Sequence, residues 1–144
     1  MKTSGPAGTP DHRVPAIVIG RGETGLGALR SLVLAGIPTY VACPQDDLIT
    51  RSRWYRPVPG GGWDGSINAA TDHALRAIPL DTAVLVPGSD DAALWLAHLP
   101  QTDLGRRFQV SSSAHPSLEI LQDKSQFGAY LATTAIPHPR TFSI

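Results

Sequence analysis

Short apolar runs recur along the chain, and segments with the apolar spacing of a helix lie between them. The runs predict buried strands, which cover residues 16–19, 38–42, 83–86 and 108–111. The helical spacing predicts helices over residues 24–35, 66–78, 92–98 and 123–134, with shorter helical turns at 48–53 and from residue 116. A short edge strand is predicted at 55–58. This alternation predicts an α/β fold, a Rossmann-like open parallel sheet with helices on both faces.

A glycine-rich turn, GRGETG at residues 20–25, connects the first predicted strand to the first predicted helix. Its G-x-G-x-x-G spacing is that of a dinucleotide-binding turn, and the amino end of the helix suits an anion. An NAD site also needs an acidic residue at the end of the second strand, whereas Asp46 and Asp47 lie beyond Pro44. An NAD-binding Rossmann domain is therefore an alternative, and a tight turn with close helix packing is the favoured role of the glycines. That structural role is assigned to Gly20 and Gly25, and the turn as a whole comprises Gly20, Gly22 and Gly25.

Two carboxylates near the predicted sheet edge are candidate substrate-binding groups. Glu23 is unusual within the glycine turn, because a carboxylate there repels a pyrophosphate. It either accepts hydrogen bonds from a substrate amine or hydroxyl, or it lies in the solvated first turn of a helix. Asp90 follows the strand predicted at 83–86, so it either lines the same crevice or caps the next helix, for which Ser89 is the other candidate.

The composition argues against several classes of function and site. The 144 residues suit one domain, and 42% hydrophobic residues allow a core. Twelve basic and twelve acidic residues cancel, which argues against nucleic-acid or membrane-surface binding driven by bulk charge. The single cysteine excludes an internal disulfide and a cysteine-based zinc site, and it fits a cytoplasmic location. No histidine pair has the spacing of a helical metal site, and no apolar run is long enough to span a membrane.

A basic and aromatic cluster follows the second predicted strand. Arg51, Arg53 and Arg56 alternate with Trp54 and Tyr55. Such a pattern occurs in proteins that bind single-stranded nucleic acid. Because the cluster is isolated in a neutral chain, we favour a surface patch or packing against another domain, and expect no nucleic-acid partner.

Four stretches together resemble the N-terminal region of the ATP-grasp ligases. In that superfamily a helix with the pattern DK…F leads to GVPxPxT, and here Asp123-Lys124 and Phe127 precede IPHPRT, with Ala135 in place of the usual glycine. The segments VIGRGETGLGALRSLVLAGIPTYVACP, RSRWYRPVP and LVPGSDDAALWLA are similar to the family's opening β-α-β unit, its third-strand region, and its fourth strand with the following helix. The resemblance covers about residues 14–144.

This resemblance implies a preATP-grasp domain at residues 14–136, after a flexible leader at 1–13 and before the start of a truncated ATP-grasp domain at 137–144. The family joins a carboxylate to an amine through an acyl phosphate, using ATP and Mg²⁺. The chain is then the substrate-side domain, inactive alone because the ATP-grasp domain is missing. Glu23 matches a residue of the family that contacts the acceptor substrate, and Thr24 and Asp90 are the further candidate substrate-binding residues. Lys124 matches a residue that contacts ATP phosphate, the alternative being an ordinary exposed lysine.

The implied partners are a small-molecule carboxylate, an amine and the missing ATP-grasp domain, with neither nucleic acid nor membrane. A homodimer is an open alternative. ATP and Mg²⁺ are expected in the full-length protein, with no cofactor bound tightly by this chain. A further alternative is a non-catalytic interaction module that binds a partner.

Overall fold

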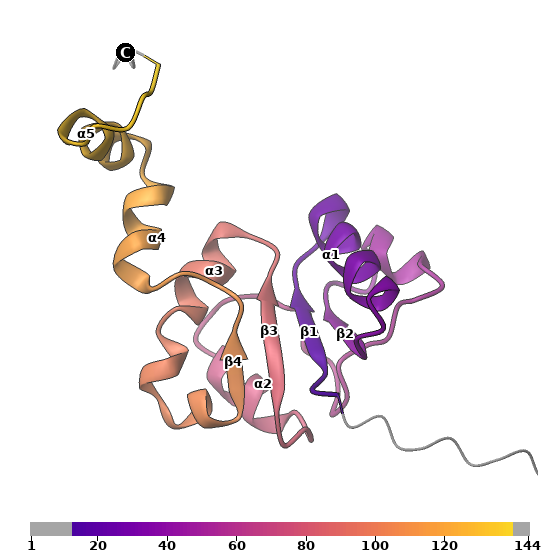
Figure 1. Ribbon diagram of the computed structural model, residues 1–144. Helices are drawn as coiled ribbons and strands as arrows, with labels where there is room; N and C mark the ends of the chain where they lie inside the picture. Colours follow the sequence, from indigo (N-terminus) through magenta and orange to yellow (C-terminus); the bar gives the residue numbers. More distant parts are fainter. Residues whose placement is uncertain (1–12, 140–144) are drawn as a thin grey trace, which may run out of the picture.

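Within residues 13–139, the part of the chain that the structure describes, four parallel strands form one open sheet (Figure 1). The computed structural model has the strand order β2-β1-β3-β4. The strands are β1 (Ala16–Ile19), β2 (Thr39–Ala42), β3 (Ala83–Pro87) and β4 (Phe108–Val110). The predicted α/β class with an open parallel sheet is therefore confirmed. The strand order reverses between β1 and β3, and crevices of this fold type form at such a point.

Helices lie on both faces of the sheet. The α-helices are α1 (Gly22–Leu34), α2 (Thr71–Ala77), α3 (Asp90–Leu96), α4 (His115–Gln122) and α5 (Lys124–Thr133). Short 3₁₀ turns are η1 (Leu48–Arg51), η2 (Leu99–Gln101) and η3 (Asp103–Arg106). Because side chains of a strand alternate between faces, Val18 packs with Leu29 of α1, whereas Ile17 belongs to the core shared with α2 and α3. The predicted cover on both faces is thus observed.

The helix predicted at 66–78 begins later than expected, at Thr71. Side-chain hydrogen bonds hold the preceding residues in turns. Asp64 accepts from the Ser66 amide at 2.9 Å, and Asn68 accepts from the Ala70 amide at 2.8 Å. The Thr71 hydroxyl accepts from the Asn68 amide at 2.8 Å. Such local bonds compete with helix formation, which explains the late start.

The edge strand predicted at 55–58 is wrong. This segment makes one isolated parallel bridge, between Val41 and Pro57, and the Val41 amide donates to the Arg56 carbonyl at 2.8 Å. Pro57 and Pro59 have no amide hydrogen, so the segment cannot continue a ladder along β2. The loop therefore follows β2 without extending the sheet.

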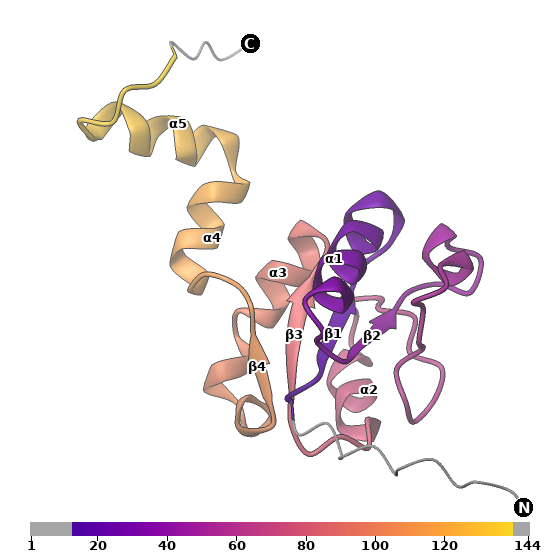
Figure 2. The same cartoon turned by 45° about the vertical axis from the view of Figure 1, so that its right-hand side comes forward.

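The chain leaves the sheet through an arm formed by α4 and α5. Both views show these helices projecting beyond β4 (Figures 1 and 2). Neither helix has a buried residue, and the Gln122 side chain donates to the Asp90 carbonyl at 2.8 Å. Asp123 caps α5 by accepting from the Ser125 amide at 2.8 Å. Residues 1–12 of the leader predicted at 1–13, and residues 140–144 of the truncated domain predicted at 137–144, lie outside the described residues.

Arg76 of α2 joins two parts of the fold through an exposed ion-pair network. Its guanidinium donates to Asp103 of η3 at 2.7 and 2.8 Å, and to Asp72 at 2.7 Å. These hydrogen bonds lower the pKa of Asp103 from 3.8 to about 2. A carboxyl whose pKa is lowered by folding stabilises the native state above its unfolded pKa. That stabilisation is lost as the pH falls through the folded value.

We expect Asp103→Asn to reduce the free energy of unfolding slightly at pH 7, because both partners are exposed and water screens them. The difference from the unmodified chain should shrink between pH 3.8 and pH 2, where Asp103 takes up its proton. Urea unfolding at several pH values measures this. Asp81→Asn, another exposed carboxylate, is the control and should show no such trend. A deficit that is independent of pH would contradict the role given to the ion pair.

Candidate functional site

A crevice opens at the carboxyl edge of the sheet, where the strand order reverses. Its cavity has a volume of about 230 Å³. The loops that follow β1, β2 and β3 all contribute to its wall. The lining residues are Ile19, Gly20, Arg21, Pro44, Asp64, Gly65, Ser66, Ile67, Ser89 and Asp91. This is the position at which open parallel sheets bind their ligands.

Two glycines bring the strand ends together at the base of the crevice. The Gly88 amide donates to the Ile19 carbonyl at 2.7 Å, and a Cβ on Gly20 would lie 2.9 Å from the Gly88 Cα. A Cβ on Gly25 would lie 2.6 Å from Ile49 Cδ1 and 3.2 Å from the Gly20 carbonyl carbon. The glycine turn thus has a geometric role, since Gly20 and Gly25 permit the close packing of helix on strand.

Asp47 closes the amino end of α1. Its carboxylate accepts from the Gly22 amide, at 3.0 Å to Oδ2 and 3.2 Å to Oδ1. The same side chain caps η1 by accepting from the Ile49 amide at 2.9 Å. A negative charge therefore lies where a dinucleotide pyrophosphate would use the positive end of the helix. Asp47 stabilises this turn from within the chain, instead of meeting a ribose from the end of β2.

The crevice itself contains charged groups of both signs. Asp64 and Asp91 supply carboxylates, and Arg21 supplies a guanidinium. Hydrogen bonds from Ser66 lower the pKa of Asp64, which further favours its ionised form. The Ser89 hydroxyl accepts from the Ala92 amide at 3.3 Å and so caps α3, as one of the two predicted caps. The wall can bind an ammonium at its carboxylates and an anionic group at Arg21.

The structure separates most of the predicted site residues from this cavity. Glu23 and Thr24 are exposed on the first turn of α1, and neither is among the lining residues. Asp90 and Asp91 are both exposed, but Asp91 lines the cavity and Asp90 does not. Lys124 is exposed at the start of α5, on the arm. Among the predicted residues, Gly20 is the one that the structure places in the cavity wall.

Three charged residues of the crevice were missed from sequence. Arg21 lies inside the glycine turn, but its side-chain direction depends on how α1 starts. Asp91 is adjacent to Asp90, and a shift of one residue on a helix turns a side chain by about 100°. Asp64 belongs to the irregular segment between η1 and α2, where periodicity gives no signal. The sequence signal for Asp64 is local: an aspartate two residues before Ser66 in a glycine-rich loop is typical of a turn closed by a side-chain hydrogen bond.

Other types of site find little support in the described part of the chain. Between residues 13 and 139, no three His, Cys, Asp or Glu side chains are grouped so that they could hold a metal ion. The helices of this same range are all too short or too polar to cross a membrane. Cys43 is buried, and burial raises its pKa.

The resemblance to ATP-grasp ligases rests on the sequence motifs alone. No protein-family model matches the chain, and the comparisons with curated proteins and with solved structures give no significant match.

Proposed function

We propose that the crevice binds a small amine-bearing substrate, and that the chain is the substrate-side domain of an ATP-dependent carboxylate–amine ligase. The observation that carries the binding proposal is that two carboxylates, Asp64 and Asp91, line a cavity where the strand order reverses between β1 and β3. An ammonium gains charge-assisted hydrogen bonds from such carboxylates. Arg21, on the same wall, suits a carboxylate or phosphate carried by the substrate.

The same crevice is a poor NAD site. Asp47 already accepts from the Gly22 amide, and its charge opposes a pyrophosphate at the amino end of α1. Asp64 and Asp91 add further negative charge to the cavity. These groups favour a cationic substrate over a dinucleotide, which supports the ligase proposal over the oxidoreductase alternative.

The ligase part of the proposal depends on the sequence resemblance. In it, an oxygen of the substrate carboxylate attacks the γ-phosphorus of ATP, which releases ADP and leaves an acyl phosphate. The amine then attacks the acyl carbon, phosphate leaves, and the nitrogen loses a proton. ATP and Mg²⁺ would bind in an ATP-grasp domain that follows the arm, to which the exposed Lys124 could add a point charge for the phosphates.

A titration with glycinamide tests the binding proposal. Saturable shifts of the Gly65 and Ser89 amide signals are expected in ¹⁵N NMR spectra, because these residues line the cavity. Asp91→Asn should weaken binding about tenfold, since one charge-assisted hydrogen bond contributes roughly 1.5 kcal/mol. Asp90→Asn removes the same charge from the neighbouring exposed residue and should change the affinity less than twofold.

Two outcomes would contradict the proposal. Equal losses in Asp91→Asn and Asp90→Asn would mean that glycinamide responds to general charge and not to the crevice. Saturable binding of NADH that shifts the same amide signals would favour the dinucleotide alternative instead.

A further inference from the structure

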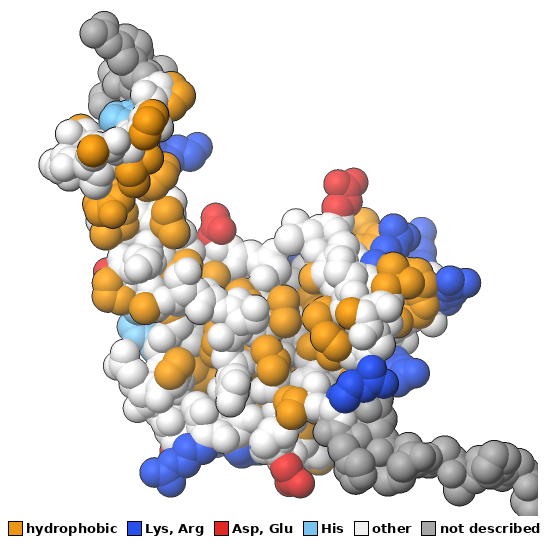
Figure 3. All heavy atoms as spheres, in the orientation of Figure 1, with side chains coloured by type: hydrophobic (Ala, Val, Ile, Leu, Met, Phe, Trp, Pro, Cys, Tyr) orange, Lys and Arg blue, Asp and Glu red, His pale blue; other side chains and the backbone are white. Residues whose placement is uncertain are grey.

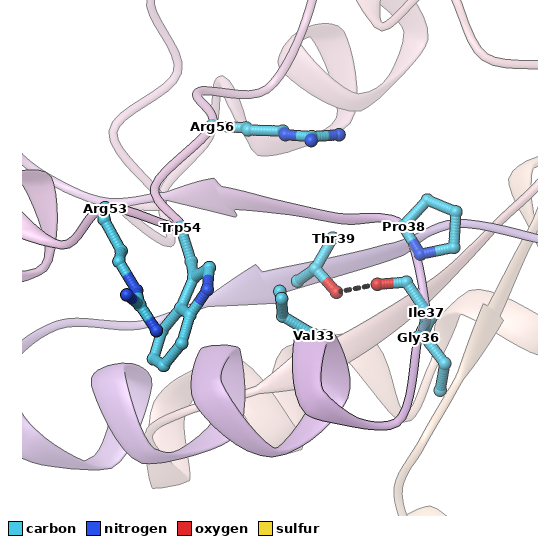
Figure 4. A pocket seen from close by; sticks show the side chains of 8 residues that line it. All are labelled: Val33, Gly36, Ile37, Pro38, Thr39, Arg53, Trp54 and Arg56. Carbon is cyan, nitrogen blue, oxygen red and sulfur yellow. Dashed lines mark hydrogen bonds between the residues drawn. The ribbon is translucent and has the colours of Figure 1, made fainter.

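A second cavity lies at the other end of β2, away from the crevice. It has a volume of about 250 Å³ and forms between the end of α1, the start of β2 and the loop after η1 (Figure 4). The lining residues, which we call the basic cavity, are Val33, Gly36, Ile37, Pro38, Thr39, Arg53, Trp54 and Arg56. Neither the glycine turn nor the proposed amine site contributes to it.

The backbone around the basic cavity is well fixed. The Gly36 amide donates to the Val33 carbonyl at 2.9 Å, and the Ile37 amide donates to the Leu32 carbonyl at 3.0 Å. With Gly36 at φ 74°, this is a Schellman motif, which satisfies carbonyls at the end of α1. The Thr39 hydroxyl donates to the Ile37 carbonyl at 2.9 Å (Figure 4). These bonds reduce the negative character that a helix end would otherwise present to an anion.

Two arginines give the cavity its charge. Figure 4 shows the Arg53 side chain along the Trp54 ring, and the Arg56 side chain apart from both and extended toward the side of Pro38. The Arg53 guanidinium lies 4.6 Å from the centroid of the Trp54 ring. Both arginines are exposed, and between residues 13 and 139 no carboxylate lies within ion-pair distance of either side chain. Their charge is therefore not neutralised by the described part of the protein.

The surroundings are also basic. Among residues 13–139, no acidic residue lines the cavity. Figure 3 shows basic side chains, which are arginines, gathered on the side of the molecule that carries α1 and β2. The remaining lining is mostly apolar, with Val33 of α1, Pro38 and the Trp54 ring. The cavity thus combines two guanidiniums with apolar walls in a small, partly enclosed volume.

We propose that the basic cavity binds a phosphate monoester carried on a ring, of the class of a nucleoside monophosphate. Arg53 and Arg56, whose planar donor groups match phosphate oxygens, would bind the phosphate. A phosphate monoester carries about −1.5 to −2 charge at neutral pH, which two guanidiniums balance. The ring would pack against Trp54 and Pro38. A cavity of about 250 Å³ suits one small ligand, and the neutral chain as a whole does not favour a nucleic-acid polymer.

A titration with AMP tests this proposal, with the Trp54 indole N–H signal as the probe. Trp54→Phe assigns that signal among the three tryptophans. AMP should shift it saturably, and adenosine and inorganic phosphate should each bind at least tenfold more weakly. Arg53→Gln and Arg56→Gln should each weaken AMP binding at least fivefold. Arg106→Gln removes an exposed arginine of η3, outside the cavity, and should change the affinity less than twofold.

Four results would overturn the proposal. The first is the absence of a saturable Trp54 shift with AMP in the folded chain. The second is an equal loss of affinity in Arg106→Gln and the two cavity variants. The third is binding of inorganic phosphate as tight as that of AMP, which would remove the ring from the site. The fourth is tighter binding of a single-stranded oligonucleotide that increases with its length, which would make this face a nucleic-acid surface.

Discussion

Replacing Gly20 with alanine is expected to lower the free energy of unfolding by about 2 kcal/mol. The added Cβ would lie 2.9 Å from the Gly88 Cα and 3.4 Å from the Gly88 carbonyl carbon and nitrogen. All of these atoms belong to the backbone, so no flexible side chain can move aside. Relief requires β1 and β3 to separate where the Gly88 amide bonds to the Ile19 carbonyl. Urea unfolding followed by tryptophan fluorescence measures the loss.

Gly27→Ala is the matched control for this change. Gly27 lies inside α1, and a Cβ there meets no atom within 4 Å. Alanine should therefore stabilise the helix, by roughly 0.5–1 kcal/mol. Gly22 gives a third case, since its φ of 63° disfavours a side chain although the space is open. If Gly20→Ala and Gly27→Ala changed stability in the same direction, the close contact between Gly20 and Gly88 would not control the packing.

The sheet was predictable because its strands are short buried runs. Alternation along Ile17, Val18 and Ile19 places side chains in the cores on both faces, and each of these residues is buried. Helix ends were harder, because capping depends on specific side chains. Ser89 was one of two candidates for α3, and the Thr71 hydroxyl, bonded back to Asn68, delays α2. Such bonds leave no periodic signal in the sequence.

The crevice was less predictable than the fold. The G-x-G-x-x-G motif correctly places Gly20 directly after β1, at the carboxyl edge of the sheet. This placement can be predicted from the order of strand, turn and helix along the chain. Which charged side chains reach the cavity depends on helix phase and on loop paths. Asp91 lines the cavity and Asp90 does not, although the two are adjacent. Asp64 reaches it from an irregular segment. Neither result can be derived from residue spacing alone.

Asp47 also has a role that residue spacing does not predict, because one of its contacts joins residues far apart in the sequence. Its bond to the Ile49 amide is a local cap that sequence rules describe. Its bond to the Gly22 amide joins residues 25 positions apart, and it forms because the β2 exit passes the start of α1. The acidic residue that a dinucleotide site would direct at a ribose here binds the protein's own backbone. One carboxylate thus fixes two segments next to the crevice.

Asp47→Ala is expected to lower the free energy of unfolding by about 2–3 kcal/mol, because the amides of Gly22 and Ile49 both lose a charged acceptor. Asp46→Ala removes the same charge from an exposed neighbour and is the control, with an expected change within about 0.5 kcal/mol. Asp47→Asn keeps one oxygen acceptor and should lose less than the alanine variant. Urea unfolding of the three variants ranks them, and equal losses in Asp46→Ala and Asp47→Ala would contradict the capping role.

The same variants show whether Asp47 excludes anions from the amino end of α1. Without its carboxylate, the Gly22 amide and the positive helix end form an open anion site. Added phosphate should then stabilise Asp47→Ala more than Asp46→Ala at the same ionic strength, because only the first variant has gained a site. An equal response would mean that the helix end stays closed for another reason. The glycine turn would then reject a pyrophosphate through its shape and not through the charge of Asp47.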